Sequence, residues 1–269
     1  MNYSSRYMEA NIDNSKKVLL NYPSAAPEET IAKYIQLLKD PAQQAMLSKG
    51  VVGLLDVHNL AFKYIVNTEF AVGISAEYFL SVGIQAYFES MVDDVNNYEV
   101  VPTFIKFLIE STKAVAPALR PNFLSYLYGV NHVRQNGVAF LTLLKVRSVA
   151  HDENGLPTLC LFSLEDIGHL TKKTVTPRMR ISFKDNCNSA EVFSLSMEER
   201  QLKKGDLFSG REVDVLKCLL KGDESKEIAE KLFISSNTVD NHRKNMIRKI
   251  DARDTTALVQ LCKMLGVLQ

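Results

Sequence analysis

Close to the carboxyl end, two segments with the apolar spacing of helices are separated by very few residues. The short connection leaves few ways in which the two helices can be arranged. The first follows Gly222 and places Ile228, Ala229 and Leu232 on one side of a helix. Only residues 233–235 separate it from a longer segment of the same periodicity. Two helices joined by such a tight turn predict a helix-turn-helix, a motif whose second helix enters the major groove of DNA.

The second of these helices has one apolar side and one polar side. With about 100° per residue, Val239, Met246 and Ile250 fall close to one line. The opposite side carries amides and cations: Asn237, Asn241, Lys244 and Arg248. Asn side chains match adenine, and Arg or Lys side chains match guanine, so we expect these four residues to face base edges. Thr238 and Lys249 lie beside them, and we expect both to meet phosphates.

Two more helices flank this pair and complete an expected all-α domain of four helices over residues 208–269. The upstream helix has the Ser-x-x-Glu spacing of a capping box at Ser209 and Glu212. Gly222 follows it, as expected for a left-handed residue at a helix end. The last helix opens near Asp254, and we expect it to bury one apolar side: Leu258, Leu261, Cys262 and Leu265.

These residues resemble the LuxR-type helix-turn-helix over the whole of residues 208–269. The matching positions are spread along the domain: Phe208–Glu212, Gly222, Ser225–Ser235, Thr238–Arg243 and Arg248–Ile250. The family consists of bacterial transcription regulators that bind double-stranded DNA, commonly as dimers. The resemblance implies phosphate contacts for Lys226 and Thr238. It implies base-facing positions for Asp240, Asn241 and Lys244. It also implies that the last helix forms the dimer, through the apolar residues Leu258, Leu261 and Leu265.

Asp240 departs from the family pattern, because some members carry a base-reading lysine at this position. An aspartate repels phosphate but accepts a hydrogen bond from cytosine N4. The departure therefore bears on the target sequence rather than on binding itself.

The amino-terminal part alternates strand and helix patterns, which predicts an α+β fold. Strand-like runs at 51–57 and 62–66 are followed by a mostly helical stretch over 69–116. Three more strand-like runs follow, with Asn154-Gly155 suited to a turn between the last two: 123–133, 138–149 and 156–164. This order resembles the PAS sensor fold, a five-stranded antiparallel sheet with helices packed against one face. The resemblance covers residues 51–168.

The remaining segments carry weaker patterns. Residues 1–50 are expected to form a helical extension, with one helix opening at Pro27 and a second reaching Leu47. Residues 169–207 are expected to be a linker that has room for a hairpin between 179–183 and 190–195. The end of this linker, residues 196–204, fits either a short helix or a charged stretch.

Composition and motif content narrow the function. The formal net charge is +1 and 46% of the residues are apolar, as in globular proteins. No apolar stretch reaches the ~20 residues that cross a membrane, so no membrane partner is expected. The four cysteines lie far apart, and no metal-ligand spacing, phosphate-binding loop or nucleophile elbow is present. We therefore expect a non-enzymatic protein of the reducing cytoplasm, without metal, cofactor or catalytic residues.

Two features of the amino-terminal part stay open to more than one interpretation. A lone histidine such as His58 or His132 is more often packed in a core than bound to haem. Aromatic residues such as Phe62, Tyr64 and Phe162 fit a core, and they also fit the lining of a ligand pocket.

Taken together, these patterns predict a transcription regulator that reads the DNA major groove as a homodimer under the control of a sensor or dimerisation domain. A small-molecule ligand of the PAS-like domain and a contact with RNA polymerase stay open as further partners. The alternative is a non-enzymatic adaptor, in which the carboxy-terminal bundle docks onto another protein instead of DNA.

Overall fold

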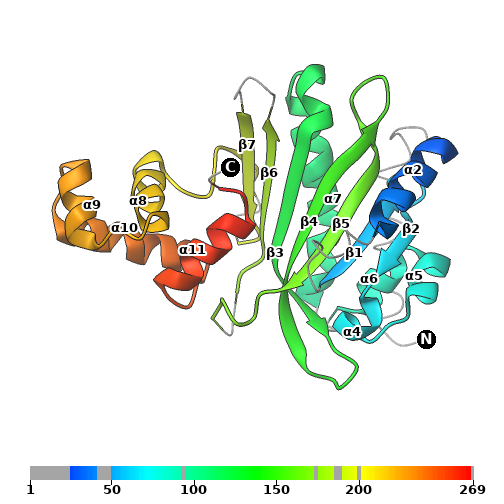
Figure 1. The fold of residues 1–269 in the computed structure, drawn as a ribbon, viewed down its shortest axis with the longest axis horizontal. Helices are drawn as coiled ribbons and strands as arrows, with labels where there is room; N and C mark the ends of the chain where they lie inside the picture. Colours follow the sequence, from blue (N-terminus) through cyan, green and yellow to red (C-terminus); the bar gives the residue numbers. More distant parts are fainter. Residues whose placement is uncertain are drawn as a thin grey trace.

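The computed structural model describes residues 25–40, 50–91, 95–172, 175–184, 190–198 and 201–267. These residues form one large antiparallel sheet with helices on both faces, and a group of four helices at the carboxyl end (Figure 1). The predicted helix up to Leu47 lies outside the described residues. The predicted helix opening at Pro27 is present as α2, Glu28–Lys39.

The sheet has eight strands in the order β2-β1-β5-β4-β3-β6-β7-β8, so the predicted five-stranded sheet is wrong. Each neighbouring pair is antiparallel. The strands are β1 Val51–Asp56, β2 Ala61–Val66, β3 Phe123–Val133, β4 Ala139–His151, β5 Pro157–Asp166, β6 Arg178–Lys184, β7 Ala190–Ser196 and β8 Lys203–Lys204.

The three additional strands come from residues 169–207, which were expected to be a linker. β6 pairs along β3, with Phe183 opposite Phe123. Its alternate side chains Met179, Ile181 and Phe183 are fully buried. This period of two gives β6 an apolar face that the sheet's core covers, which explains why the segment joins the sheet. At Lys203–Lys204 the chain forms the short strand β8, where a helix or a charged stretch was expected.

One face of the sheet packs against helices that lie between β2 and β3 in the sequence. These are α4 Thr68–Val72, α5 Ala76–Val82, α6 Ile84–Glu89 and α7 Val95–Ala114, followed by a 3₁₀-helix, Pro117–Asn122. Figure 1 shows α7 running behind the sheet. Phe104 and Phe107 of α7 share a buried cluster with Leu127 of β3 and Phe162 of β5. Phe62 and Phe162 meet edge to face, with ring centroids 5.2 Å apart.

The other face is divided between two groups of helices. The α2 helix covers β1 and β5, where Ile31 and Leu38 pack with Val52, Leu54 and Leu159. The carboxy-terminal helices adjoin the opposite part of this face, near β3 and β4, where the last of them lies next to the sheet and the others extend away from it (Figure 1). They are α8 Gly210–Leu220, α9 Ser225–Leu232, α10 Ser236–Lys249 and α11 Thr255–Met264.

We predict that Gly83→Ala destabilises the sheet domain more than Gly137→Ala. Both glycines have positive φ, 65° and 77°. A Cβ at Gly83 would lie 2.4 Å from the carbonyl oxygen of Leu60, whereas a Cβ at Gly137 meets nothing within 4 Å. A positive φ costs a residue with a Cβ about 1–2 kcal/mol, and the ψ of −134° at Gly83 adds to this cost, because that combination is essentially restricted to glycine. The contact with Leu60 adds to this cost at Gly83 only. Urea unfolding of the two variants measures the difference, and equal losses would contradict it.

Candidate nucleic-acid interface

The α9–α10 pair has the tight turn that the sequence predicts. α9 ends at Leu232, and Phe233 adopts a left-handed conformation with φ 54°. α10 starts three residues later, at Ser236, and the Ser235 side chain before it accepts a hydrogen bond from the Thr238 amide at 3.0 Å. The left-handed residue reverses the chain direction, and the serine cap satisfies an amide at the start of the next helix.

The two sides of α10 differ in burial as predicted. Val239, Met246 and Ile250 are fully buried and pack with Ile228 of α9 and Leu216 of α8. On the opposite side, the four side chains predicted to face bases are all exposed: Asn237, Asn241, Lys244 and Arg248. α10 therefore presents a continuous polar surface while its apolar side is held by the bundle. We call these four residues the reading face.

Asp240, also predicted to face bases, is held at the edge of the reading face by a polar network. Its carboxylate accepts a hydrogen bond from Ser225 Oγ at 2.9 Å and lies 3.4 Å from Arg243 Nη1. Arg243 also donates to Ser225 Oγ at 2.7 Å and to Thr255 Oγ1 at 2.9 Å. In this arrangement Asp240 and Arg243 connect the starts of α9 and α11 to α10.

The three residues predicted to meet phosphates are placed differently from one another. Lys226 is exposed on α9, and the described residues contain no ion pair for it. Thr238 is half-buried, and its hydroxyl lies 2.8 Å from Ser235 Oγ. Lys249 Nζ donates to Glu212 Oε2 at 2.6 Å, so its ammonium is paired within the domain.

Glu212 connects the capping box of α8 to the end of α10. Its Oε2 accepts from the Ser209 amide at 2.7 Å as well as from Lys249, and its own amide donates to Ser209 Oγ. Burial by itself would raise the pKa of this carboxyl. The hydrogen bonds from Lys249 and Ser209 outweigh that effect and hold the pKa of Glu212 below its ordinary value.

The last helix lies next to the sheet, and the residues predicted to form a dimer are buried inside the monomer. Leu258, Leu261 and Leu265 belong to one buried cluster with Tyr126 and Tyr128 of β3. The predicted burial of one apolar side of α11 is therefore confirmed, because the sheet and the helical bundle share one core that encloses it. The predicted dimer contact through these leucines stays a prediction.

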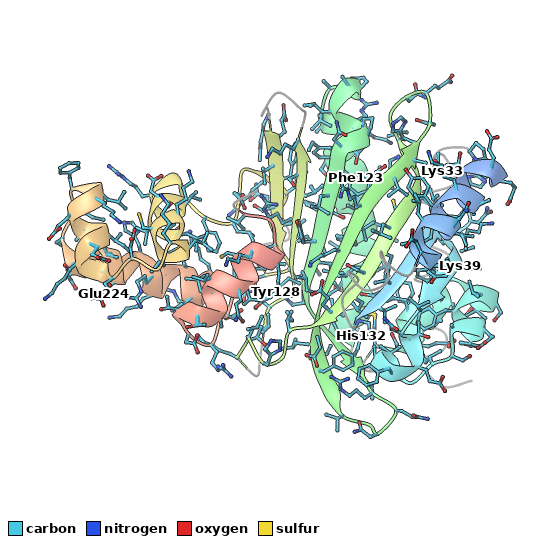
Figure 2. The ribbon with its side chains drawn as sticks, viewed as in Figure 1. Lys33, Lys39, Phe123, Tyr128, His132 and Glu224 are labelled. Atoms are coloured by element: carbon cyan, nitrogen blue, oxygen red, sulfur yellow. The ribbon has the colours of Figure 1, made fainter. Side chains whose placement is uncertain are left out.

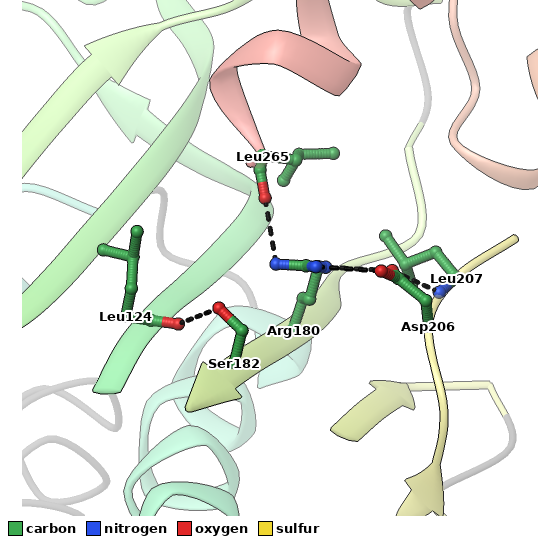
Figure 3. Close-up of polar contacts among 6 residues, drawn as sticks. All are labelled: Leu124, Arg180, Ser182, Asp206, Leu207 and Leu265. Atoms are coloured by element: carbon green, nitrogen blue, oxygen red, sulfur yellow. Dashed lines mark hydrogen bonds and ion pairs between the residues drawn. The ribbon is translucent and has the colours of Figure 1, made fainter. Parts of the chain in front are cut away.

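A buried arginine holds the helical bundle to the sheet (Figure 3). Arg180 of β6 is 4% exposed. Its Nε and Nη2 donate to the two carboxylate oxygens of Asp206, at 2.9 and 2.8 Å, in a bidentate pair. Its Nη1 donates to the carbonyl oxygen of Leu265, at the end of α11, at 3.2 Å.

A second set of contacts holds the segment that follows α10. Arg178 Nη1 donates to Asp251 Oδ2 at 2.8 Å, and the Tyr128 hydroxyl donates to the carbonyl oxygen of Ile250. The backbone pairs as well, since the Lys172 amide donates to Asp251 O at 2.9 Å and the Arg253 amide donates to Leu170 O at 3.0 Å. The bundle is therefore fixed to the sheet domain by both side chains and backbone.

Sequence reasoning did not identify these docking residues. The available signal is the alternation in β6, where Arg178, Arg180 and Ser182 point away from the core that holds Met179 and Ile181. Two arginines on one face of a strand indicate that carboxylates or carbonyl oxygens lie opposite them, but the pattern does not identify the residues that supply these groups.

Other side chains of the types that catalyse reactions or bind metals do not cluster into a site in the part of the chain that the structure describes. No cluster of three metal-ligating side chains occurs among the described residues. His132 and Cys160 are buried within the sheet domain, and His58 lies after β1. Within the same residues, no helix has the length and apolar content that crossing a membrane requires.

We predict that Glu212→Gln lowers stability at neutral pH and flattens its pH dependence in acid. Gln keeps the capping box but loses the charged contact with Lys249, a loss of about 1–2 kcal/mol. Because the folded pKa is depressed, the wild-type contribution is complete above the ordinary value of 4.5 and is lost as the pH falls through the folded pKa.

The matched control for this change is Glu227→Gln, the same position in the exposed capping box of α9, where Glu227 accepts from the Glu224 amide. Urea unfolding between pH 3 and 7 separates the two variants. A Glu212→Gln variant with the pH profile of the wild type would contradict the prediction.

Comparison with known proteins assigns the helical bundle to a family. The family described as bacterial regulatory proteins, luxR family, matches residues 206–262. The transcriptional regulatory protein MctR of Rhizobium johnstonii is 36% identical over 80 residues, which are 30% of this chain and 37% of MctR. The chain thus spans about a third of the length of the curated relatives it first matches.

A solved structure and a shorter relative extend the comparison. The Vibrio cholerae VqmA–ligand–DNA complex aligns over 86% of this chain and 85% of that chain, with 16% identity and a TM-score of 0.29. A TM-score of this size does not establish a shared arrangement of the whole chain. The spore germination protein GerE of Bacillus subtilis is 36% identical over 69 residues, which are 25% of this chain and 93% of GerE. Since nearly all of GerE is matched, the chain belongs to the luxR family of bacterial regulatory proteins.

Proposed function

We propose that this protein regulates transcription by inserting α10 into the major groove of double-stranded DNA. The observation that carries the proposal is the reading face: Asn237, Asn241, Lys244 and Arg248 are exposed at the spacing of one helix side, while the other side is anchored in the core. Residues 242–249 carry four basic side chains and no acidic one. Amides and cations on one exposed helix side match base edges and phosphates.

Within this proposal, phosphate contacts come from Lys226 and, after small side-chain movements, from Thr238 and Lys249. Asp240 lies near the bases at the edge of the reading face, where a carboxylate accepts from cytosine N4. Its hydrogen bonds to Ser225 and Arg243 restrict its rotation, so it selects among bases only in one orientation.

The sheet domain is proposed to be the sensor that controls the helical bundle. Its first five strands and the helices α4–α7 come in the element order on which the resemblance to PAS sensors rests. The bundle docks directly on this domain, through Arg178, Arg180 and Tyr128. A change in the sheet domain therefore reaches the bundle without passing through a free linker.

Dimer formation through α11 requires a second arrangement of the bundle, because Leu258, Leu261 and Leu265 are enclosed in the docked one. The proposed control is a population shift between a docked bundle and a released bundle whose α11 pairs with a second copy. A signal favours release only by binding the released arrangement more tightly than the docked one. RNA polymerase is a further proposed partner of the DNA-bound dimer.

We expect Lys244→Glu to weaken DNA binding by about tenfold or more and to lower its salt dependence. Loss of one base contact costs about 1–3 kcal/mol, and loss of one phosphate contact reduces the salt slope by about one. Lys33→Glu is the matched control, since Lys33 lies on α2, at the opposite end of the molecule from α9 (Figure 2). Fluorescence anisotropy with random and selected duplexes at several salt concentrations measures both effects.

If the wild type shows no salt-sensitive binding to any duplex, the adaptor function replaces the DNA-binding one. Equal affinities of the Lys244→Glu and Lys33→Glu variants would show that DNA is bound by another surface.

A separate prediction concerns docking. Arg178→Gln removes the ion pair with Asp251 and should increase the released population up to about fivefold, since such a pair contributes up to about 1 kcal/mol. Lys145→Gln is the control, because it breaks the pair with Glu165 on the same sheet without touching the bundle. Hydrogen exchange at the Lys172 and Arg253 amides, which bond across the docking contact, reports release. Identical exchange in the two variants would contradict the docking role.

A further inference from the structure

A polar groove lies where the helical bundle meets the sheet, on the face of the sheet opposite to α7. Its volume is about 540 Å³, within the range of about 300–1,000 Å³ that ligand clefts occupy. Strands β3, β4, β6 and β7 supply its floor. The bundle supplies a wall through Asp206, which precedes α8, and through Gly266 and Val267, which follow α11. We call this space the seam groove.

The floor of the seam groove is one row of residues across four strands. Arg147 of β4 pairs with Leu124 of β3, which pairs on its other side with Ser182 of β6. Ser182 in turn pairs with Val192 of β7. Residues directly opposite each other in a sheet share a face, so all four side chains lie on the bundle side. Lys184 lies two residues beyond Ser182 on β6 and therefore shares this face.

The seam groove carries an excess of positive charge. Its described lining contains the cations Arg147, Arg180 and Lys184 and one carboxylate, that of Asp206. This carboxylate is already paired with Arg180 through both oxygens. Within the residues that the structure describes, neither Arg147 nor Lys184 forms an ion pair. Two positive charges therefore face the groove without a described counter-charge.

Arg180 gives the groove a buried polar end. Its guanidinium has five N–H groups, and the bonds to Asp206 and Leu265 use three of them. The side chain is 4% exposed, so the other two N–H groups have little access to water. Figure 3 shows Leu124 and Ser182 on one side of the guanidinium and Asp206 on the other. A buried cation with unused donors at the end of a positively charged groove favours an anion as the occupant.

The lining defines the class of anion that fits. A phosphate monoester carries a charge of about −1.5 to −2 and three acceptor oxygens, which match two cations and their donors. The groove also has apolar lining from Pro121, Val192 and Val267, which suits an organic part attached to the phosphate. A wholly apolar molecule would leave both positive charges unmatched.

We propose that the seam groove binds an organic phosphate monoester, with the phosphate between Arg147 and Lys184 and with the docked bundle closing the site. This inference rests on the proposed equilibrium between docked and released bundle, and it names an effector for that equilibrium. Arg147 and Lys184 belong to the sheet, whereas Gly266 and Val267 belong to the bundle, so release opens the site. The anion therefore binds the docked arrangement more tightly and holds the bundle in place.

The first test measures binding to the full chain without DNA. The probes are adenosine 5′-monophosphate (AMP) and adenosine, which differ only in the phosphate. Isothermal titration calorimetry should show AMP bound at least about tenfold more tightly than adenosine. Arg147→Gln and Lys184→Gln should each weaken AMP binding by about tenfold or more, because each removes a hydrogen bond to a charged group. Both side chains are exposed, so these variants should fold normally.

The matched control is Lys145→Gln. Lys145 lies two residues before Arg147 on the same face of β4, but its ammonium is paired with Glu165 and it does not line the groove. This variant should keep the AMP affinity of the wild type.

The second test measures the link to docking through hydrogen exchange at the Lys172 and Arg253 amides, which bond across the docking contact. At an AMP concentration ten times its Kd, exchange through release should slow about tenfold in the wild type. At the same concentration the effect should be much smaller in Arg147→Gln.

The inference is overturned if AMP binds no more tightly than adenosine, if Arg147→Gln and Lys145→Gln bind AMP equally, or if AMP leaves the exchange unchanged. Neither test contains DNA, so these failures leave the DNA-binding proposal standing. The docking equilibrium itself is tested without AMP by Arg178→Gln, so its failure is also distinguishable from failure of the anion site.

Discussion

The arrangement of the whole molecule depends on one buried cation. Arg180 reaches from the sheet to both ends of the helical bundle, because Asp206 precedes α8 and Leu265 follows α11. A guanidinium taken out of water must have its charge paired and its donors satisfied. If the bundle left the sheet, the Arg180 guanidinium would lose these partners or become exposed to water. The cation lies over the Tyr126 ring as well, 5.8 Å from its centroid. The geometry of these contacts therefore favours one position of the bundle on the sheet over slightly shifted positions.

The parts of the structure that sequence patterns predicted are those governed by local periodicity. The buried line of Val239, Met246 and Ile250 follows from 3.6 residues per turn, and the exposed amides and cations opposite follow from the same geometry. The capping box at Ser209 and Glu212 is equally local, because all its bonds lie within one turn. For the candidate site, this reasoning identified the reading face correctly as a surface, while its contacts with bases stay a prediction.

Sequence patterns could not predict which segments far apart in the chain pair or pack with each other. Residues 178–196 have the alternation of a hairpin, yet nothing local says that β3 has a free edge to receive them. The leucines of α11 were recognised as apolar, but the pattern cannot say whether a second copy or the sheet covers them. Lys249 shows the same difficulty for a charge, since its pairing with Glu212 joins residues 37 positions apart.

The short strand that ends the sheet has a consequence for how copies of this protein meet. β8 consists of Lys203 and Lys204 alone, and both side chains are exposed. A long uncharged border would invite strand addition from another chain, whereas two lysines on a two-residue border oppose it by charge and by lack of length. Addition of a strand from another copy at β8 is thereby discouraged, whereas β2, which forms the other edge of the sheet, lacks this protection.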